Sequence, residues 1–280
     1  MTSFFNRFPD SGYVCAHRGA RSIAPENTWF AMEQARQCGA DLWETDVQLT
    51  ADGEPVLFHD TTLERTTDIS DHPKFADRSI RVTDFTAAEL VTLNAGSWFL
   101  SADPFKTVTS GDVAEGFYPE IKEQKIPRLN DVLEYCRRNN FPLNLEIKDQ
   151  RGTTADGRIV GKVLTCLKES ETEGLVLISS FNHDYLRQVK QLNPCIAIAA
   201  LVEKHHPENL LKYLRSLDVD AYHPDKSITS PEQVRELVAA GMRVNLWTVN
   251  DLDRAKEFIA AGTTFICTDW PQKMVATSHS

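Results

Sequence analysis

The sequence lacks any apolar run of about 18 residues, the length that a membrane-spanning helix requires. It therefore predicts no membrane span. Residues 1–12 contain Phe4, Phe5 and Phe8 but no continuous apolar stretch, so we expect no secretory signal and, by default, a cytoplasmic location. The six cysteines form no close pair, which excludes the spacing of zinc and thioredoxin-like motifs.

The sequence also lacks an excess of basic residues. Its 40 acidic and 30 basic side chains give a formal net charge of −10 at pH 7. Nucleic acid and anionic membranes favour basic surfaces, so we expect neither as a partner. An anionic small molecule would instead need a local cationic site, which a divalent cation in an acidic pocket would supply. A homo-oligomer is compatible with the sequence.

Short apolar runs alternate with amphipathic segments along the chain. The runs that we predict as strands are residues 13–18, 42–49, 55–59, 143–148, 175–181, 196–202, 219–223, 243–249 and 264–268. Helical patterns lie between most of them. Repeated strand–helix units imply a parallel sheet with right-handed crossovers.

Nine strands are one more than an eight-stranded barrel contains, and one short link identifies the surplus strand. Residues 50–55 are too few for a parallel crossover, which takes about a dozen residues. Their Asp52-Gly53 pair is a hairpin signal. We therefore predict that 55–59 pairs antiparallel with 42–49, outside an eight-stranded parallel barrel. The predicted fold class is α/β, a (β/α)8 TIM barrel formed by residues 1–280 as a single domain.

Residues 61–126 interrupt this alternation with many polar and turn residues. Thr86 and Glu89 form a capping-box pattern that predicts a short helix, and the rest is predicted as loop. A connection this long in a compact domain is usually functional or mobile. We expect this insertion, between the second and third barrel strands, to cover the barrel mouth. Residues 277–280 are predicted as a polar tail that frays.

Polar side chains gather where the predicted strands end. Glu44 and Asp46 are two residues apart, as are Glu146 and Lys148, so each pair points to one face of its strand. Further polar or aromatic strand ends are His17, Arg18, His59 and Trp247. Active groups of a (β/α)8 barrel come from the carboxyl ends of its strands, so we expect these residues to share one site.

The three carboxylates indicate a metal site. Glu44, Asp46 and Glu146 lie within apolar runs, which argues against ordinary solvated positions. Carboxylates gathered at one point stay ionised only when a cation lies among them. Oxygen ligands suit a hard ion, so we predict one divalent cation, Mg²⁺ or Ca²⁺.

The motif at residues 17–19 indicates proton transfer and phosphate binding. The imidazole of His17 suits acid or base chemistry near neutral pH. Arg18 can hold phosphate oxygens with a fork of donors, and Lys148 adds a point charge. Gly19 has no side chain, so we expect a ligand to approach the backbone there.

Taken in order, these motifs resemble the glycerophosphodiester phosphodiesterase family. The resemblance covers residues 13–271 and rests on His17-Arg18-Gly19, Pro25-Glu26-Asn27-Thr28, Glu44-Thr45-Asp46-Val47, Phe58-His59-Asp60, Leu63-Glu64-Arg65-Thr66-Thr67, Leu145-Glu146-Ile147-Lys148, Ser179-Ser180-Phe181, Trp247-Thr248-Val249-Asn250 and Thr268-Asp269-Trp270-Pro271. The family is similar in fold to the phosphatidylinositol phospholipases C, which agrees with the predicted barrel.

The resemblance implies a role for each candidate residue. His17 and His59 correspond to the acid–base pair of the family. The implied metal ligands are Glu44, Asp46 and Glu146, and the implied phosphate-binding cations are Arg18 and Lys148. It also implies that Glu26 orients Arg18 and that Phe181 and Trp247 form walls of the pocket. Trp270 stands where a smaller or different residue is common, which affects the expected shape of the pocket.

We therefore expect metal-dependent hydrolysis of glycerophosphodiesters to sn-glycerol 3-phosphate and an alcohol. The nucleophile is either the neighbouring glycerol hydroxyl or water, and the sequence does not decide between them. One alternative is a lysophospholipase D or a related phosphodiester lyase acting on lipids, with an apolar ramp built from Phe99, Leu100, Phe105 and Phe117. The other alternative is a binding module without catalysis on the same barrel.

Three further histidines carry weaker signals. His223 could line the pocket or simply end a strand, and the sequence favours neither. His205 and His206 precede a proline in a loop, so we expect both on the surface.

Overall fold

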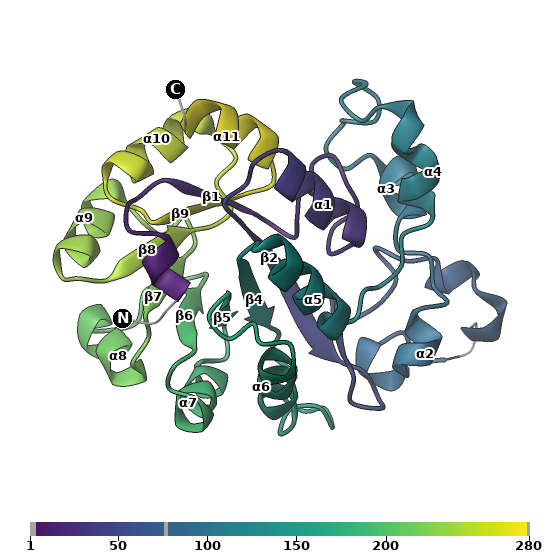
Figure 1. Ribbon diagram of the computed structural model, residues 1–280, viewed down its shortest axis with the longest axis horizontal. Coiled ribbons are helices and arrows are strands. Elements are labelled where there is room, and N and C mark those ends of the chain that lie inside the picture. Colours follow the sequence, from purple (N-terminus) through teal and green to yellow (C-terminus); the bar gives the residue numbers. More distant parts are fainter. Residues whose placement is uncertain (1–3, 76–77, 279–280) are drawn as a thin grey trace.

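The structure is a computed structural model that describes residues 4–75 and 78–278 (Figure 1). Within these residues nine strands form one sheet. Eight of them run parallel and close into a barrel, because β1 pairs with β2 as well as with β9. The strands are β1 (Tyr13–Ala16), β2 (Leu42–Leu49), β3 (Pro55–Leu57), β4 (Leu143–Ile147), β5 (Val176–Ser180), β6 (Ala197–Val202), β7 (Ala221–Pro224), β8 (Arg243–Leu246) and β9 (Phe265–Thr268). The predicted (β/α)8 barrel is confirmed.

The antiparallel strand β3 lies outside the barrel, where the short link predicts it. It pairs with β2, so that Val47 lies opposite Leu57 and Leu49 lies opposite Pro55. Gly53 has a φ of +80° in the turn between them, which a residue without Cβ adopts freely. A link this short allows only a hairpin, so β3 adds a ninth strand without entering the closed ring.

Helices surround the barrel (Figure 1), and α1 and α5 to α11 contribute buried apolar residues to the core around it. In α5, for example, Leu129, Val132, Leu133 and Cys136 are buried at helical spacing. The long helices are α1 (Trp29–Gln37), α5 (Leu129–Asn139), α6 (Ile159–Glu169), α7 (His183–Leu192), α8 (Leu210–Leu217), α9 (Pro231–Ala239), α10 (Leu252–Ala260) and α11 (Pro271–Ser278). The expectation of a frayed tail over 277–280 is wrong for residues 277 and 278, which belong to α11, and residues 279–280 lie outside the described part.

The insertion contains more helix than the sequence predicts. Besides α2 (Ala87–Leu90), where the capping box of Thr86 and Glu89 is present, it forms α3 (Ser97–Ala102) and α4 (Tyr118–Lys122). Four 3₁₀ turns accompany them, namely η2 (Ile69–Asp71), η3 (Pro73–Phe75), η4 (Val82–Asp84) and η5 (Glu115–Phe117). The prediction of loop was wrong because elements of three to six residues are too short to display a hydrophobic period.

Aromatic side chains close the amino-terminal end of the barrel. The 3₁₀ helix η1 (Phe4–Arg7) places Phe4 and Phe5 in a buried cluster with Phe8 and Phe265. The rings of Phe5 and Phe265 stack with their centroids 6.1 Å apart. The barrel is therefore packed at this end, and its cavity opens at the carboxyl ends of the strands.

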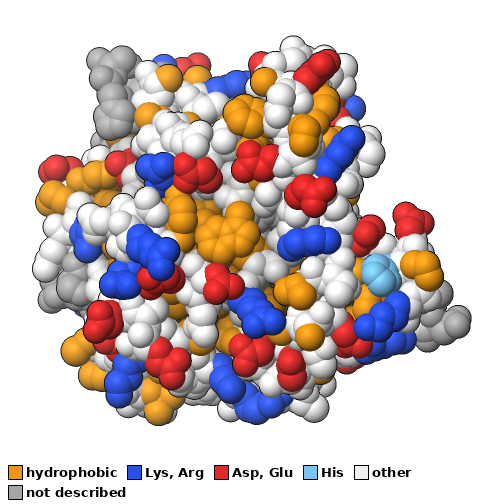
Figure 2. All heavy atoms as spheres, turned by 45° about the vertical axis from the view of Figure 1, so that its right-hand side comes forward, with side chains coloured by type: hydrophobic (Ala, Val, Ile, Leu, Met, Phe, Trp, Pro, Cys, Tyr) orange, Lys and Arg blue, Asp and Glu red, His pale blue; other side chains and the backbone are white. Residues whose placement is uncertain are grey.

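On the face of the molecule that carries the insertion, acidic and basic side chains are interspersed and form no broad basic area (Figure 2). Among the described residues, no helix has both the length and the apolar character needed to cross a membrane.

Candidate active site

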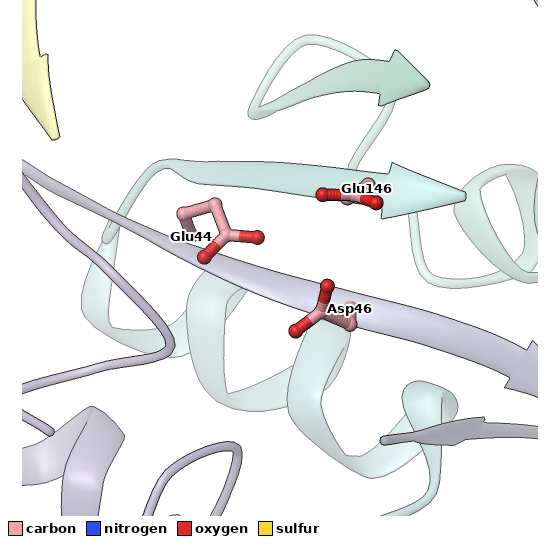
Figure 3. A group of neighbouring side chains, drawn as sticks. All are labelled: Glu44, Asp46 and Glu146. Atoms are coloured by element: carbon pink, nitrogen blue, oxygen red, sulfur yellow. The ribbon is translucent and has the colours of Figure 1, made fainter. Parts of the chain in front are cut away.

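Three carboxylates meet inside the barrel, and we call them the carboxylate trio: Glu44, Asp46 and Glu146. The strand register places Asp46 beside Glu146, and Glu44 lies two residues earlier on the same face of β2. One carboxylate oxygen of each lies within 4.8 Å of the others. Figure 3 shows the carboxylates turned toward one another from β2 and β4. All three residues are at least nine-tenths buried, so they are not solvated strand positions.

The trio holds more negative charge than burial favours. Burial raises the pKa of Glu44 well above its ordinary value, and the charges of Asp46 and Glu146 raise it further. Burial likewise raises the pKa of Glu146, and the charge of Asp46 adds to this shift, while Lys148 opposes it. Burial also acts to raise the pKa of Asp46, but Lys148, His59 and Arg18 outweigh it and hold that pKa far below its ordinary value.

The donor set fits a divalent cation. Asp46 Oδ1 is buried and receives no hydrogen bond from the described residues, although Lys148 Nζ lies 3.3 Å away outside hydrogen-bond geometry. An anionic oxygen without a donor, facing two further carboxylates, is suited to a hard metal ion. The described residues can thus hold a metal at the trio.

Arg18 and Lys148 flank the trio as predicted. The backbone N–H of Arg18 donates to Glu44 Oε2 at 2.9 Å, and its Nε lies 3.5 Å from Asp46 Oδ2. Lys148 Nζ lies 2.7 Å from Glu146 Oε1. Arg18 has a φ of +53°, an uncommon backbone conformation for a residue with a side chain. This conformation lets one residue direct both its N–H and its guanidinium at the trio.

The role expected of Gly19 is wrong. A Cβ at this position would lie 2.6 Å from the backbone oxygen of Ala31, so the missing side chain makes room for α1 and not for a ligand. With a φ of +82°, Gly19 also turns the chain sharply after the strand end. It therefore fixes the place of Arg18 indirectly, by letting α1 pack close to the loop after β1.

Glu26 lies among three arginines, two of which the sequence did not single out. It accepts hydrogen bonds from Arg18 at 2.8 Å, from Arg21 at 2.9 Å and from Arg65 at 2.6 Å. Burial acts to raise the pKa of Glu26, but Arg18 and the other two guanidiniums lower it to about 2. Glu26 thus holds Arg18 as predicted and links it to the insertion through Arg65.

Each candidate catalytic histidine has its own aspartate. His17 Nδ1 donates to Asp269 Oδ1 at 2.7 Å, and His59 Nδ1 donates to Asp60 Oδ1 at 2.6 Å. His17 Nε2 then faces the trio, 4.0 Å from Glu44 Oε2. Burial and the charge of Arg18 lower the pKa of His17 to about 4, so its ring is neutral at neutral pH.

The two aspartates are held by further donors. Asp60 Oδ2 accepts from Arg65 Nε at 2.6 Å, and Asp269 Oδ2 accepts from Asn250 Nδ2 at 2.7 Å. Both aspartates lie in motifs that carry the family resemblance, Phe58-His59-Asp60 and Thr268-Asp269-Trp270-Pro271. Membership in these motifs is the sequence signal for the two aspartates, but the sequence alone does not predict that they orient the histidines.

A cavity of about 190 Å³ joins these groups. Its lining includes both histidines, Arg18, Glu44 and Glu146, together with Phe181 and Trp247. The last two rings meet edge to face with centroids 5.5 Å apart, and Phe181 is 40% exposed at the mouth. The structure therefore brings these candidate residues around one space, with the aromatic pair as a wall, whereas Asp46, Lys148 and Glu26 do not line it.

His223 lines this cavity. The expectation that His206 lies on the surface is wrong. The ring of His206 is half-buried and hydrogen-bonds to Tyr222 Oη and to the backbone oxygen of Ile228, both at 2.8 Å. His205 is exposed as expected. A loop position before proline does not reveal such partners, because they come from β7 and the loop after it.

Of the four residues expected in an apolar ramp, Phe117 is 40% exposed, Leu100 and Phe105 are half-buried, and Phe99 is buried. Phe99 is fully buried, and Phe117 packs on Phe30 with ring centroids 5.4 Å apart. Phe105 instead meets Trp270 edge to face at 5.8 Å. Trp270, the departure noted from the family pattern, thereby joins the insertion to the end of β9.

A (β/α)8 barrel with carboxylates, cations and two histidine–aspartate pairs at the carboxyl ends of its strands has the architecture of a barrel enzyme. Residues 17–273 match the Glycerophosphoryl diester phosphodiesterase family. The chain belongs to this family, which confirms the resemblance and the prediction of a phosphodiesterase.

Two curated relatives match nearly the whole chain. A glycerophosphodiester phosphodiesterase of Caldanaerobacter subterraneus subsp. tengcongensis is 34% identical over 262 residues, which cover 94% of this chain and 96% of the relative. One of Bacillus altitudinis is 32% identical over 267 residues, covering 94% and 96%.

A solved structure agrees with both the fold and the family. It is a phosphodiesterase of Oleispira antarctica in complex with the product sn-glycerol-3-phosphate, 31% identical to this chain. The match has a TM-score of 0.78 and covers 96% of this chain and 97% of the other.

Proposed function

We propose that this chain hydrolyses glycerophosphodiesters to sn-glycerol 3-phosphate and an alcohol, with one divalent cation at the carboxylate trio and with His17 and His59 as the acid–base pair. The observation that carries the proposal is the convergence of both histidines on the trio. His17 Nε2 lies 4.0 Å from Glu44, and His59 lines the same cavity as Glu44 and Glu146. The product found in the Oleispira antarctica enzyme supports the same product here.

The proposed cation would be Mg²⁺ or Ca²⁺, held by Glu44, Asp46 and Glu146. When bound, such an ion supplies Lewis-acid stabilisation of negative charge on a phosphoryl group. Arg18 and Lys148 add positive charge from the protein at the same place. Their positions are fixed before substrate arrives, because Glu26 holds Arg18 and Glu146 holds Lys148.

The histidine–aspartate pairs prepare proton transfer at Nε2. Because Asp269 accepts the Nδ1 proton of His17, the neutral ring has its lone pair on Nε2. A neutral imidazole in this tautomer can take a proton from a nucleophile. Asp60 orients His59 in the same way. In the proposed reaction one histidine removes a proton from the nucleophile, and the other donates a proton to the leaving alkoxide.

The identity of the nucleophile remains a prediction. The nucleophile is the neighbouring glycerol hydroxyl or water, and detection of a cyclic phosphate during turnover distinguishes them. The lipid-directed alternative is not favoured, since Phe99 of the expected ramp is buried. The cytoplasmic location and the homo-oligomer also stay predictions.

Replacement of the histidines tests the proposal. His17→Ala and His59→Ala should each lower kcat on glycerophosphocholine by about 10² to 10⁴, the usual contribution of a positioned acid or base. The exposed His205→Ala is the control and should keep wild-type turnover. Wild-type turnover in both active-site variants would refute the assignment.

A further inference from the structure

The cavity has a second set of side chains beside the carboxylate trio, and we call it the polar wall: Asn144, Ser179 and His223. Asn144 precedes Glu146 by two residues on β4, so both face the barrel interior. The strand register places Ser179 of β5 beside Glu146. All three residues of the polar wall line the cavity that also contains Glu44 and Glu146.

Two atoms of the polar wall are buried without a hydrogen-bond partner among the described residues. They are Asn144 Oδ1 and Ser179 Oγ, on residues that are 6% and 0% exposed. Buried polar atoms are nearly always paired, so such atoms indicate a missing partner. Ser180, which follows on the opposite face of β5, has its hydroxyl paired with the backbone oxygen of Ile147 at 2.7 Å. Both unpaired atoms belong to residues that line the cavity, whereas Ser180 does not line it.

Asn245 fixes the state of the third member, His223. The Oδ1 of Asn245 accepts the N–H of Phe265 at 3.2 Å, so its amide nitrogen donates to His223 Nε2. The ring proton of a neutral His223 must then lie on Nδ1, which hydrogen-bonds to none of the described residues. Burial lowers the pKa of His223 to about 3, which keeps the ring neutral.

The polar wall therefore offers an acceptor, a hydroxyl that can donate or accept, and an N–H donor, all without charge. An alcohol hydroxyl complements this set, because it donates one hydrogen bond and accepts two. A charged group is disfavoured, since the wall has no opposite charge to pair with it. The charged groups of the cavity lining instead lie at Arg18, Glu44 and Glu146.

We propose that the polar wall binds the primary hydroxyl on carbon 1 of the substrate's glycerol arm. This inference rests on the proposed function, in which the trio, Arg18 and Lys148 take the phosphate. With the phosphate there, the neighbouring hydroxyl stays near the trio, and the hydroxyl one carbon further is directed to the wall. A cavity of about 190 Å³ suits a three-carbon arm.

The polar wall should make the enzyme select for glycerol. A site that pairs with a hydroxyl rejects an analogue without it strongly, because its own buried polar atoms are then left unpaired. The test compares glycerophosphocholine with its 1-deoxy analogue, the phosphocholine diester of propane-1,2-diol. This analogue keeps the phosphate, the neighbouring hydroxyl and the leaving group. Wild-type kcat/KM should be lower for it by on the order of 10²-fold.

Ser179→Ala tests whether the polar wall causes the selectivity for glycerophosphocholine over the 1-deoxy analogue. It should lower kcat/KM for glycerophosphocholine by about tenfold and leave the 1-deoxy analogue nearly unchanged, so that the ratio between the substrates falls. Calorimetry with sn-glycerol 3-phosphate and its 1-deoxy analogue should show the same loss of selectivity in Kd. Ser180→Ala is the matched control from the other face of β5, and it should keep the wild-type ratio even if its Tm falls.

The outcomes separate this inference from the proposed function. Equal kcat/KM of the wild type for both diesters would overturn the inference, as would full selectivity retained by Ser179→Ala. If Ser179→Ala does not fold, the wild-type ratio decides alone, and a ratio near one overturns the inference. Turnover of neither diester by the wild type would overturn the proposed function itself.

Discussion

His17 and Asp269 lie 252 residues apart in the sequence and meet at a hydrogen bond of 2.7 Å from Nδ1 to Oδ1. The parallel pairing of β1 with β9 closes the barrel and brings the two strand ends together. This contact fixes which nitrogen of His17 faces the carboxylate trio. The closure of the fold and the protonation state of a candidate catalytic group are therefore linked.

Asp269→Asn tests this link. An amide nitrogen at this position would donate to Nδ1 and place the ring proton on Nε2, where it blocks base catalysis. We expect kcat to fall by on the order of 10²-fold or more, with little change in KM. Asp253→Asn, an exposed change on α10, is the control. A kcat within twofold of the wild type would show that Asp269 does not set the tautomer.

Glu26→Gln tests the arginine network. Removing the charge leaves Arg18, Arg21 and Arg65 around a neutral amide, and we expect unfolding free energy to fall by about 3 kcal/mol, as for a broken buried ion pair. Glu134→Gln, in an exposed pair with Arg137, should change it by less than about 0.5 kcal/mol. Chemical denaturation at neutral pH measures both. Equal effects of the two variants would contradict the network.

The lowered pKa of Glu26 predicts that the stability of the protein depends on pH. Folding lowers the pKa of Glu26 from 4.5 to about 2, so its ion pairs stabilise the protein above pH 4.5 and lose that effect as the pH falls toward 2. The wild type should therefore lose more stability across this window than Glu26→Gln, which has no proton to gain. Denaturation midpoints measured between pH 4.5 and pH 2 give the loss of stability of each protein. Equal losses in the wild type and in Glu26→Gln would rule out the lowered pKa of Glu26.

Gly19→Ala and Gly111→Ala separate crowding from backbone strain. Both glycines have a φ near +80°, but a Cβ at Gly19 would lie 2.6 Å from Ala31, whereas a Cβ at Gly111 would meet nothing within 4 Å. Gly111→Ala should lower stability by about 1 kcal/mol, the strain term alone. Gly19→Ala should lower it by at least about 3 kcal/mol, because overpacking adds to the strain. Similar losses of stability in the two variants, measured by thermal unfolding, would mean that α1 moves away from a side chain at residue 19 at little cost in free energy.

Much of the fold could be predicted because its signals are local. The alternation of apolar runs predicts the strands, and the short link over residues 50–55 shows which strand leaves the ring. The helices α3 and α4 could not be found in the same way, since six and five residues give too little of a helical period. Their positions depend on packing within the insertion.

The candidate site was predictable where a residue type by itself indicates chemistry. Glu44, Asp46 and Glu146 share one face of adjoining strands, and residue spacing alone suggests that. The pairing of His17 with Asp269 depends on barrel closure, which the sequence does not specify residue by residue. Asn144 and Ser179 carry no charge and have no distinctive spacing, so only their unpaired buried atoms in the folded barrel identify them.

The central claim is that one divalent cation binds among Glu44, Asp46 and Glu146 beside the two imidazoles. Anomalous diffraction from crystals soaked in Mn²⁺, a hard ion that can replace Mg²⁺, tests it most directly. The account predicts one anomalous peak inside the barrel, within about 2.6 Å of an oxygen from each of the three carboxylates. A peak bound by other residues, or no peak from an enzyme that remains fully active in chelator, would contradict it.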